Sequence, residues 1–256
     1  MTERGWYPRA RPARPVSRAK NVGVTLVALI AAFGLMTLFR PDQVSSIAEM
    51  FGIAKPHRLL FVVGPKVGSS HYSILGTDAA GDPITYDPCR SVHYVINPSG
   101  APADYLDFID PAIDKAQSAS GLKFVYDGLS RDTWSEHTHA TKDEPVLLSF
   151  PSSLDSKADA DAVGLGGSAF LKSTHPGHSH YATGQIALLR SWFRKQSARH
   201  KTAAEQSVVM HELGHVIGLG HVRDRQQVMY PKSHGQTEYG NGDLAGLAKL
   251  GSGPCE

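Results

Sequence analysis

The segment HELGHVIGLGH, residues 211–221, places three histidines and one glutamate within eleven residues. On a helix, His211 and His215 share one face because they are four residues apart, so their ring nitrogens can meet at one point. Imidazole is a good ligand for zinc, and a catalytic zinc site takes three protein ligands and one water molecule. The spacing therefore predicts a zinc ion held by these two histidines, with Glu212 beside it.

The third ligand has to come from beyond the helix. If the helix continued, His221 would lie roughly 15 Å along the axis from His211 and could not reach the same ion. Gly218 can adopt the left-handed conformation that ends a helix and turns the chain back. We therefore expect the helix to end near Gly218 and His221 to complete the ligand set.

Such a site is suited to amide hydrolysis. Three neutral histidines leave the metal its full double charge, which lowers the pKa of its bound water towards neutrality. Glu212 can take a proton from that water and pass it to a leaving amine, so it is the candidate general base. The short pattern HExxH also arises by chance in amphipathic helices, but the extended pattern with the third histidine is much more specific.

The motif must lie on a helix, and residues 201–220 predict one. Thr202 can cap this helix, with Glu205 three residues later to complete a capping box. Gly218 ends it. Its apolar face consists of Val208, Val209, Leu213, Val216 and Ile217. A last short helix is predicted in GDLAGLAKLG, with Asp243 near its start.

The elements before this helix predict an α+β fold. The run VHYVIN is typical of a strand, and in residues 101–121 the apolar side chains recur at helical spacing. Further strands are predicted in LKFVYDG, VLLSF, AVGLGGSAFL and GQIALL, residues 122–128, 146–150, 162–171 and 184–189. The order of elements indicates a sheet packed on long helices in one domain, residues 84–256.

The first part of the chain has a different composition. Residues 1–21 form a basic tail, and residues 22–39 carry no charge. As a helix the uncharged run would span roughly 27 Å, close to the hydrocarbon core of a bilayer. The basic flank predicts a cytoplasmic N-terminus, with everything after Arg40 outside. The alternatives are a cleaved signal peptide, which would give a secreted protein, and a buried core helix. Residues 40–83 are turn-rich and predict a stalk or linker, or a small prosegment.

Charge and cysteine content narrow the choice of partners and compartment. The net charge of +2 is too small to indicate a nucleic-acid partner. Cys89 and Cys255 both follow the predicted anchor. In an oxidising exterior an isolated pair most simply forms a disulfide, which would tie the start of the domain to the end of the chain. Two free thiols are the alternative.

The zinc motif carries a family resemblance. HELGHVIGLGH resembles the extended signature of the metzincin metallopeptidases, and Met229 in VMYP resembles their Met-turn. Both stretches are most similar to the matrixin branch, which includes the matrix metalloproteinases and bacterial relatives. The resemblance implies a twisted, mostly parallel sheet, a structural methionine beneath the metal at Met229, and catalytic Glu212. It also implies the zinc ligands His211, His215 and His221.

The resemblance extends to substrate binding. It implies that the glycine-broken strand near residues 164–170 is the edge on which an extended substrate pairs, as in strand addition. It places the specificity pocket beneath the metal, which here indicates the segment YPKSHGQTEYG. The similarity spans residues 84–256 and is specific over residues 211–231 and weaker elsewhere.

Two features depart from the family pattern. Vertebrate matrixins block the zinc with a propeptide cysteine, but Cys89 in YDPCRSVHY lacks the surrounding residues, and pairing with Cys255 is the favoured hypothesis. Matrixins also bind a structural zinc, and three nearby histidines could form a second site, although a solvated loop is the favoured interpretation: His175, His178 and His180. His137 and His139 are interpreted in the same way. An additional structural zinc or calcium ion is therefore only a possibility, and no acidic loop has convincing calcium spacing.

The combined prediction is a membrane-anchored, outward-facing zinc endopeptidase that acts on proteins or peptides, with a bacterial surface protein as the favoured setting. The alternative is a surface module that keeps one zinc ion for stability and catalyses nothing. The intact Glu212 argues against that alternative, because a silent scaffold needs no proton shuttle.

Overall fold

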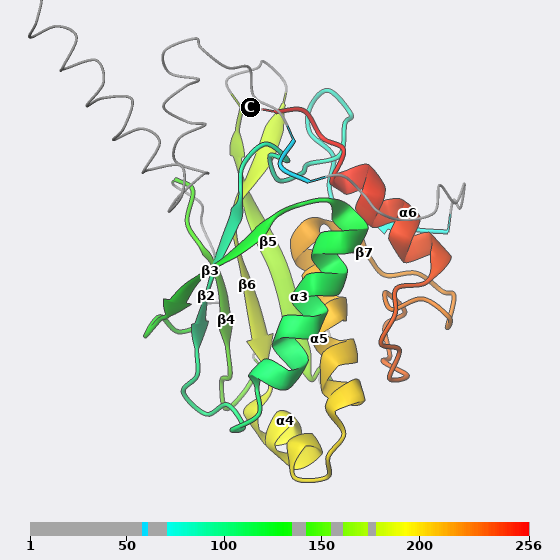
Figure 1. Cartoon of the computed structure of the whole chain (residues 1–256). Helices are drawn as coiled ribbons and strands as arrows, with labels where there is room; N and C mark the ends of the chain where they lie inside the picture. Colours follow the sequence, from blue (N-terminus) through cyan, green and yellow to red (C-terminus); the bar gives the residue numbers. More distant parts are fainter. Residues whose placement is uncertain (1–57, 61–70, 135–141, 155–160, 174–177, 256) are drawn as a thin grey trace, which may run out of the picture. The chain divides into compact units, whose positions relative to one another are not determined.

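The computed structural model describes most of the chain that follows the predicted anchor (Figure 1). The chain divides into two units, Met1–Lys55 and Pro56–Glu256. The first unit, with the predicted basic tail and anchor, lies outside the described residues. No helix within the described part is long and apolar enough to cross a membrane. The described residues are 58–60, 71–134, 142–154, 161–173 and 178–255.

A five-stranded sheet forms one layer of the second unit, in the order β3-β2-β4-β6-β5. The pairs β2–β3, β2–β4 and β4–β6 are parallel, whereas β5 runs antiparallel to β6. The sheet is therefore mostly parallel, with one antiparallel strand at an edge, and the fold is α+β as predicted. The strands are β2 (Val92–Asn97), β3 (Phe124–Leu129), β4 (Val146–Ser149), β5 (Gly164–Lys172) and β6 (Ser179–Leu188).

Two long helices, α3 (Leu106–Ser120) and α5 (Thr202–Ile217), lie side by side (Figure 1). α5 contacts β5 and β6, and the buried side chains of α3 belong to the same core cluster as those of the strands. Fully buried apolar side chains from both layers form the core between them, including Phe108, Ile109, Leu148, Ile186 and Leu213. A shorter helix, α6 (Asn241–Leu250), packs against α3 and α5. This packing fixes α5, which carries the candidate ligands His211 and His215, on two sides.

The start of α5 differs from the prediction. The helix is preceded by Lys201 as its N-cap, Thr202 lies inside it, and no side chain caps it. Glu205 is fully buried and so does not reach back to the helix start. The predicted capping box is therefore wrong, because the tertiary packing of the first turn takes the glutamate into the core.

The structure adds a helix that the sequence did not predict, α4 (Arg190–Ser197), which joins β6 to α5. This helix is only eight residues long and mostly polar, and only Phe193 is buried in it, so no apolar segment of helical length marks it in the sequence. It also adds a short antiparallel pair, β1 (Ser73–Ile74) with β7 (Leu219–Gly220). Part of the segment assigned to a stalk therefore packs beside the turn that leads to His221.

A disulfide joins Cys89 to Cys255 across a separation of 166 residues. This confirms the predicted pairing. The Cα atoms lie 5.4 Å apart, within the normal range for a disulfide. The bridge fixes the end of the chain, just beyond α6, to the segment that leads into β2.

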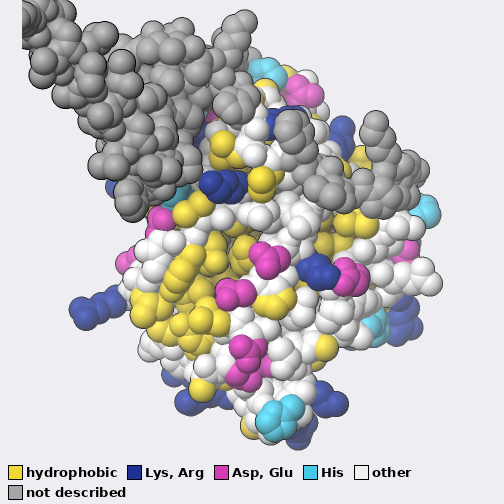
Figure 2. Space-filling model, viewed as in Figure 1, with side chains coloured by type: hydrophobic (Ala, Val, Ile, Leu, Met, Phe, Trp, Pro, Cys, Tyr) yellow, Lys and Arg dark blue, Asp and Glu magenta, His cyan; other side chains and the backbone are white. Residues whose placement is uncertain are grey.

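Apolar side chains are exposed beside α3 (Figure 2). Three of the five large exposed apolar residues in the described part of the chain come from α3 and β3, namely Leu106, Tyr126 and Leu129. Acidic side chains of α3 lie next to this area.

Candidate active site

The three motif histidines converge. His211 and His215 lie one turn apart on α5, which ends at Gly218 with φ 120°, in the left-handed region. The chain then runs through β7 and returns His221 to the same point. Each pair of Nε2 atoms among the three rings is separated by 3.1 Å.

Two backbone carbonyls fix the ring orientations. The Nδ1–H group of His211 donates to the carbonyl of Val228 at 2.7 Å, and that of His215 donates to the carbonyl of Leu219 at 2.8 Å. A carbonyl can only accept, so both Nε2 atoms carry lone pairs directed at the shared point. Burial is the main cause that lowers the pKa of His211 to about 4 and that of His215 to about 3.

The donor set fits zinc. The Nε2 lone pairs of His211 and His215 cannot satisfy one another by a hydrogen bond, whereas a cation between them can bind both, with His221 Nε2 as a third ligand. Separations of 3.1 Å suit a single ion bound at Zn–N distances of about 2.0–2.1 Å. His211, His215 and His221 also form one group of potential metal ligands in the described chain.

Glu212 is buried beside the ligands and lies against the edge strand β5. Burial raises the pKa of its carboxyl to about 8, while the Gly166 N–H, which donates to it, acts in the opposite direction. A Cβ atom at Gly164 would lie 2.6 Å from Glu212 Oε1, and one at Gly166 would overlap the Glu212 backbone oxygen. These glycines therefore allow β5 to approach the helix closely enough to hold the carboxylate.

A cavity of about 580 Å³ connects these groups. It is lined by the three histidines, Glu212 and residues 161–166 of the β5 region. Trp192 from α4 and Val208 from α5 contribute apolar walls. The sequence had not identified Trp192, because nothing in its local pattern shows that α4 brings it to the site.

Met229 lies fully buried under the helix, as the Met-turn resemblance implied. A Cβ atom at Gly214 would overlap its Sδ atom, which explains the glycine between Glu212 and His215. The carboxylate of Asp243 accepts hydrogen bonds from the N–H groups of Val228 at 2.6 Å and Met229 at 3.4 Å.

Asp243 therefore supports a metal ligand indirectly. Its carboxylate holds the amide of Val228, and the carbonyl of Val228 holds His211. From the sequence Asp243 was recognised only as the start of the last helix. Its link to His211 runs through the tertiary structure, so no local signal could have shown it.

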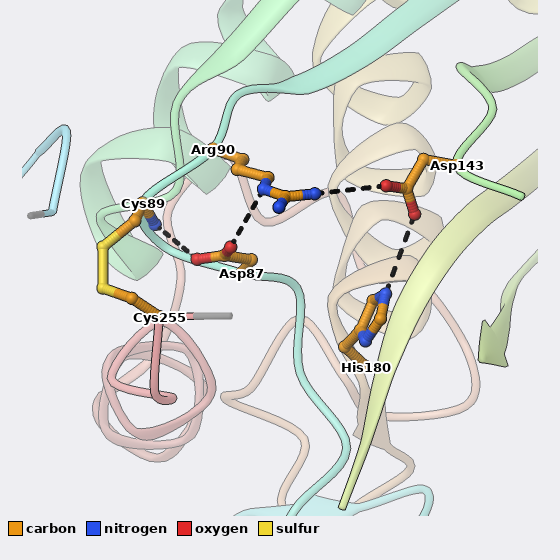
Figure 3. Close-up of polar contacts among 6 residues, drawn as sticks. All are labelled: Asp87, Cys89, Arg90, Asp143, His180 and Cys255. Carbon is orange, nitrogen blue, oxygen red and sulfur yellow. Dashed lines mark hydrogen bonds and ion pairs between the residues drawn. A yellow bond between two sulfur atoms is a disulfide. The ribbon is translucent and has the colours of Figure 1, made fainter. Parts of the chain in front are cut away.

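The other candidate histidines do not form a common site. His178 Nδ1 lies 3.1 Å from Asp78 Oδ2 and 3.9 Å from Asp82 Oδ2. His180 Nε2 lies 3.7 Å from Asp143 Oδ1 (Figure 3). The structure thus directs His178 and His180 to different acidic partners. His137, His139 and His175 lie outside the described residues, so an additional structural metal stays a prediction.

Figure 3 also shows how the disulfide is anchored. The Asp87 carboxylate accepts a hydrogen bond from the N–H of Cys89 at 2.8 Å. It also forms an ion pair with Arg90, whose Nε lies 3.3 Å from Asp87 Oδ2. The other end of Arg90 lies 3.5 Å from Asp143. This network is structural and does not include any of the three converging histidines.

Comparison with known proteins gives one result. Residues 133–250 match the model of the matrixin family, which covers the described chain from β4 to α6 and includes the histidine triad, Glu212 and Met229. No curated protein is significantly similar to the chain.

Proposed function

We propose a hydrolytic mechanism, a substrate-binding strand and a cellular location for this chain, whose residues 133–250 form a matrixin metalloendopeptidase domain with the zinc-binding histidine triad of that family. The observation that carries the proposal is the convergence of three Nε2 atoms at 3.1 Å beside a buried carboxylate in one cavity.

In the proposed mechanism His211, His215 and His221 hold the zinc ion. When bound, the ion would provide Lewis-acid chemistry, namely polarisation of the peptide carbonyl and acidification of a water molecule. Glu212 is the proposed general base. Burial raises its pKa, but the charge of the bound ion would favour the ionised form. The carboxylate would then accept a proton from the attacking water and later deliver it to the leaving amine. The Gly166 N–H holds this carboxylate in place between the two transfers.

The proposed substrate is an extended peptide that lies along β5. This strand is at the end of the sheet order, and Gly164–Gly166 line the cavity, so backbone groups of the substrate can approach. Strand addition would orient the peptide by main-chain hydrogen bonds. Trp192 and Val208 would then contact an apolar side chain of the substrate.

We further propose that residues 22–39 anchor the protein in a membrane, with the domain on the outer side. The supporting observations are the uncharged run, its basic flank and the disulfide, which requires an oxidising compartment. Protease treatment of intact cells tests this: an outward domain is degraded while the N-terminal tail is protected. Release of the chain without residues 22–39 would instead support the secreted form.

The activity is tested by incubating the purified full chain with an unfolded protein and identifying the fragments by mass spectrometry. Internal cleavage should disappear on removal of zinc by a chelator and return when zinc is restored. If the zinc-loaded, folded protein leaves the substrate intact, the alternative of a zinc-stabilised binding module replaces the peptidase proposal.

A further inference from the structure

A row of acidic residues runs along the exposed face of α3. Asp107, Asp110 and Asp114 are three and four residues apart, so their side chains share one face of the helix, and all three are exposed. Among the described residues, no lysine, arginine or histidine forms an ion pair with any of them. Lys115, on the same helix, pairs instead with Glu238.

The acidic row is electrostatically crowded. Partial burial and the neighbouring carboxylates of Asp114 and Asp107 raise the pKa of Asp110. Like charges at this spacing destabilise a helix. The helix dipole favours an acid in the first turn, where Asp107 lies, but it does not extend to Asp114 in the third turn. Folding of α3 therefore does not explain the row.

Aromatic and apolar side chains border the same row. Tyr126 packs on Tyr94 with ring centroids 5.2 Å apart, and Asp110 lies close enough to contribute to the raised pKa of both tyrosines, after burial. Leu106 and Leu129 are 41% and 66% exposed. Figure 2 shows the acidic side chains of α3 beside this hydrophobic area.

We propose that this surface binds a lysine- and arginine-rich segment of the protein substrate, outside the cleft in which the peptide bond is cut. The surface consists of Leu106, Asp107, Asp110, Asp114, Tyr126 and Leu129 and is called the α3–β3 surface below. Carboxylates pair with the cationic heads, the tyrosine ring can accept a cation on its face, and the leucines can contact the aliphatic stems. The proposal rests on the peptidase function proposed above.

The position of the α3–β3 surface determines how many residues must separate the cleaved bond of the substrate from its basic segment. β3 and β5 are the two edges of the five-stranded sheet, so the β3 part of the surface, Tyr126 and Leu129, lies four strand intervals from the edge strand of the cleft. At about 4.8 Å per interval the direct distance is roughly 19 Å. An extended chain covers about 3.3 Å per residue. A substrate must therefore place roughly six residues or more between the cleaved bond and its basic segment to reach both.

Binding is tested separately from cleavage. The probe is a fluorescent peptide of six alternating lysines and arginines, and the protein is the full chain in detergent with Glu212→Ala. Fluorescence anisotropy at low salt should show binding that Asp107→Asn, Asp110→Asn and Asp114→Asn together weaken about tenfold or more. A matched control, Asp82→Asn, Asp143→Asn and Glu144→Gln, removes the same charge from another surface and should bind as the parent does. Thermal unfolding verifies that both variants fold.

Equal weakening in the control and in the α3 variant would overturn the proposal, because attraction would then depend only on net charge. Residues 1–21 of the chain itself are a competing occupant, since they are also basic. If the peptide binds only after those residues are removed, the surface belongs to them and the assignment to a substrate is overturned.

Cleavage provides the second test, with Glu212 intact. Three substrates share one cleavable sequence: the first ends there, and the other two continue into the basic segment after a spacer of three or fifteen residues. The long-spacer substrate should be cut with kcat/KM about tenfold higher than the other two, and the triple α3 variant should lose only this gain. A gain that persists in the α3 variant would overturn the proposal. If the wild-type chain cuts none of the three substrates while the basic peptide still binds, the result counts against the peptidase function and not against the α3–β3 surface.

Discussion

At the scale of single residues, the site is explained by what each polar atom can accept or donate. The Val228 and Leu219 carbonyls accept the Nδ1 protons of His211 and His215, so the Nε2 lone pairs of these two rings face one point. His221 Nε2 lies 3.1 Å from both, so one cation can bind all three nitrogens. Asp243 also helps to orient His211, because its carboxylate fixes the Val228 peptide group to which His211 is hydrogen-bonded.

Asp243→Asn should therefore weaken zinc binding without removing a ligand. Replacing a group that orients a metal ligand typically costs 10–100-fold in affinity. The zinc Kd, measured by competition with a chromophoric chelator, is expected to rise by about that factor. Glu238→Gln, an exposed change close in sequence, is the control, and an unchanged Kd in Asp243→Asn would contradict the indirect support of His211.

Gly214→Ala should destabilise the fold, because the new methyl group would overlap the buried Sδ atom of Met229. Overpacking of this kind typically costs about 1–3 kcal/mol. Urea unfolding of the zinc-loaded protein measures the loss. Gly167→Ala is a matched control, since nothing lies within 4 Å of its added Cβ atom. Equal stability of the two variants would refute this account of the glycine.

At the scale of elements, the first turn of α5 contains a buried carboxyl group. Glu205 is fully buried, and neither oxygen forms a hydrogen bond of regular geometry with a described residue. Burial and the Asp104 carboxylate raise its pKa to about 7, whereas the Ser197 N–H partly favours the charged form. The charged form therefore opposes folding of this turn.

The sign of the pH effect follows from this shift. The pKa is raised from 4.5 in the unfolded chain to about 7 in the folded protein. Stability linked to Glu205 is therefore full below pH 4.5 and is lost as the pH rises through 7, by roughly 3 kcal/mol at most. Glu205→Gln should remove this loss, so the variant should gain stability over the wild type between pH 5 and pH 8 in urea unfolding. If the free energies of unfolding of the two proteins differ by the same amount at every pH, the assignment of the pH effect to Glu205 is contradicted.

Local patterns predicted those elements whose side chains alternate or repeat over many residues. The strands β2 and β4 and the helices α3 and α5 belong to this class. The helix α4 has eight mostly polar residues, and the β1–β7 pair has two residues on each side, so both elements are too short to be recognised from an apolar pattern. The capping box prediction failed because Glu205 is buried near Asp104, which precedes α3, and Ser197, the last residue of α4. The sequence of α5 alone does not show that these segments meet.

At the scale of the whole molecule, distant segments meet at the site. The motif predicted the meeting of three histidines, since helix periodicity and one glycine are local properties. The support from Asp243 and the wall formed by Trp192 depend on how α6 and α4 pack, which the sequence pattern does not encode locally. The disulfide was predictable because the chain has only two cysteines.

Replacing both Cys89 and Cys255 by serine should lower stability but not abolish zinc binding. The bridge closes a long loop, and loss of such a native disulfide typically costs about 2–5 kcal/mol. The free energy of unfolding and the zinc content of the double variant check this. Loss of zinc at temperatures where the variant stays folded would contradict the separation between the bridge and the histidines.

The most direct test of the account compares Glu212→Gln with the wild type at equal, measured zinc content. The side chain keeps its size but loses the ability to accept a proton, so kcat for cleavage of an unfolded protein should fall by about 10²–10⁴-fold. Zinc content should stay at one ion per chain in both proteins, since the three histidines are unchanged. Cleavage by zinc-loaded Glu212→Gln at the wild-type rate would contradict the proposed role of Glu212.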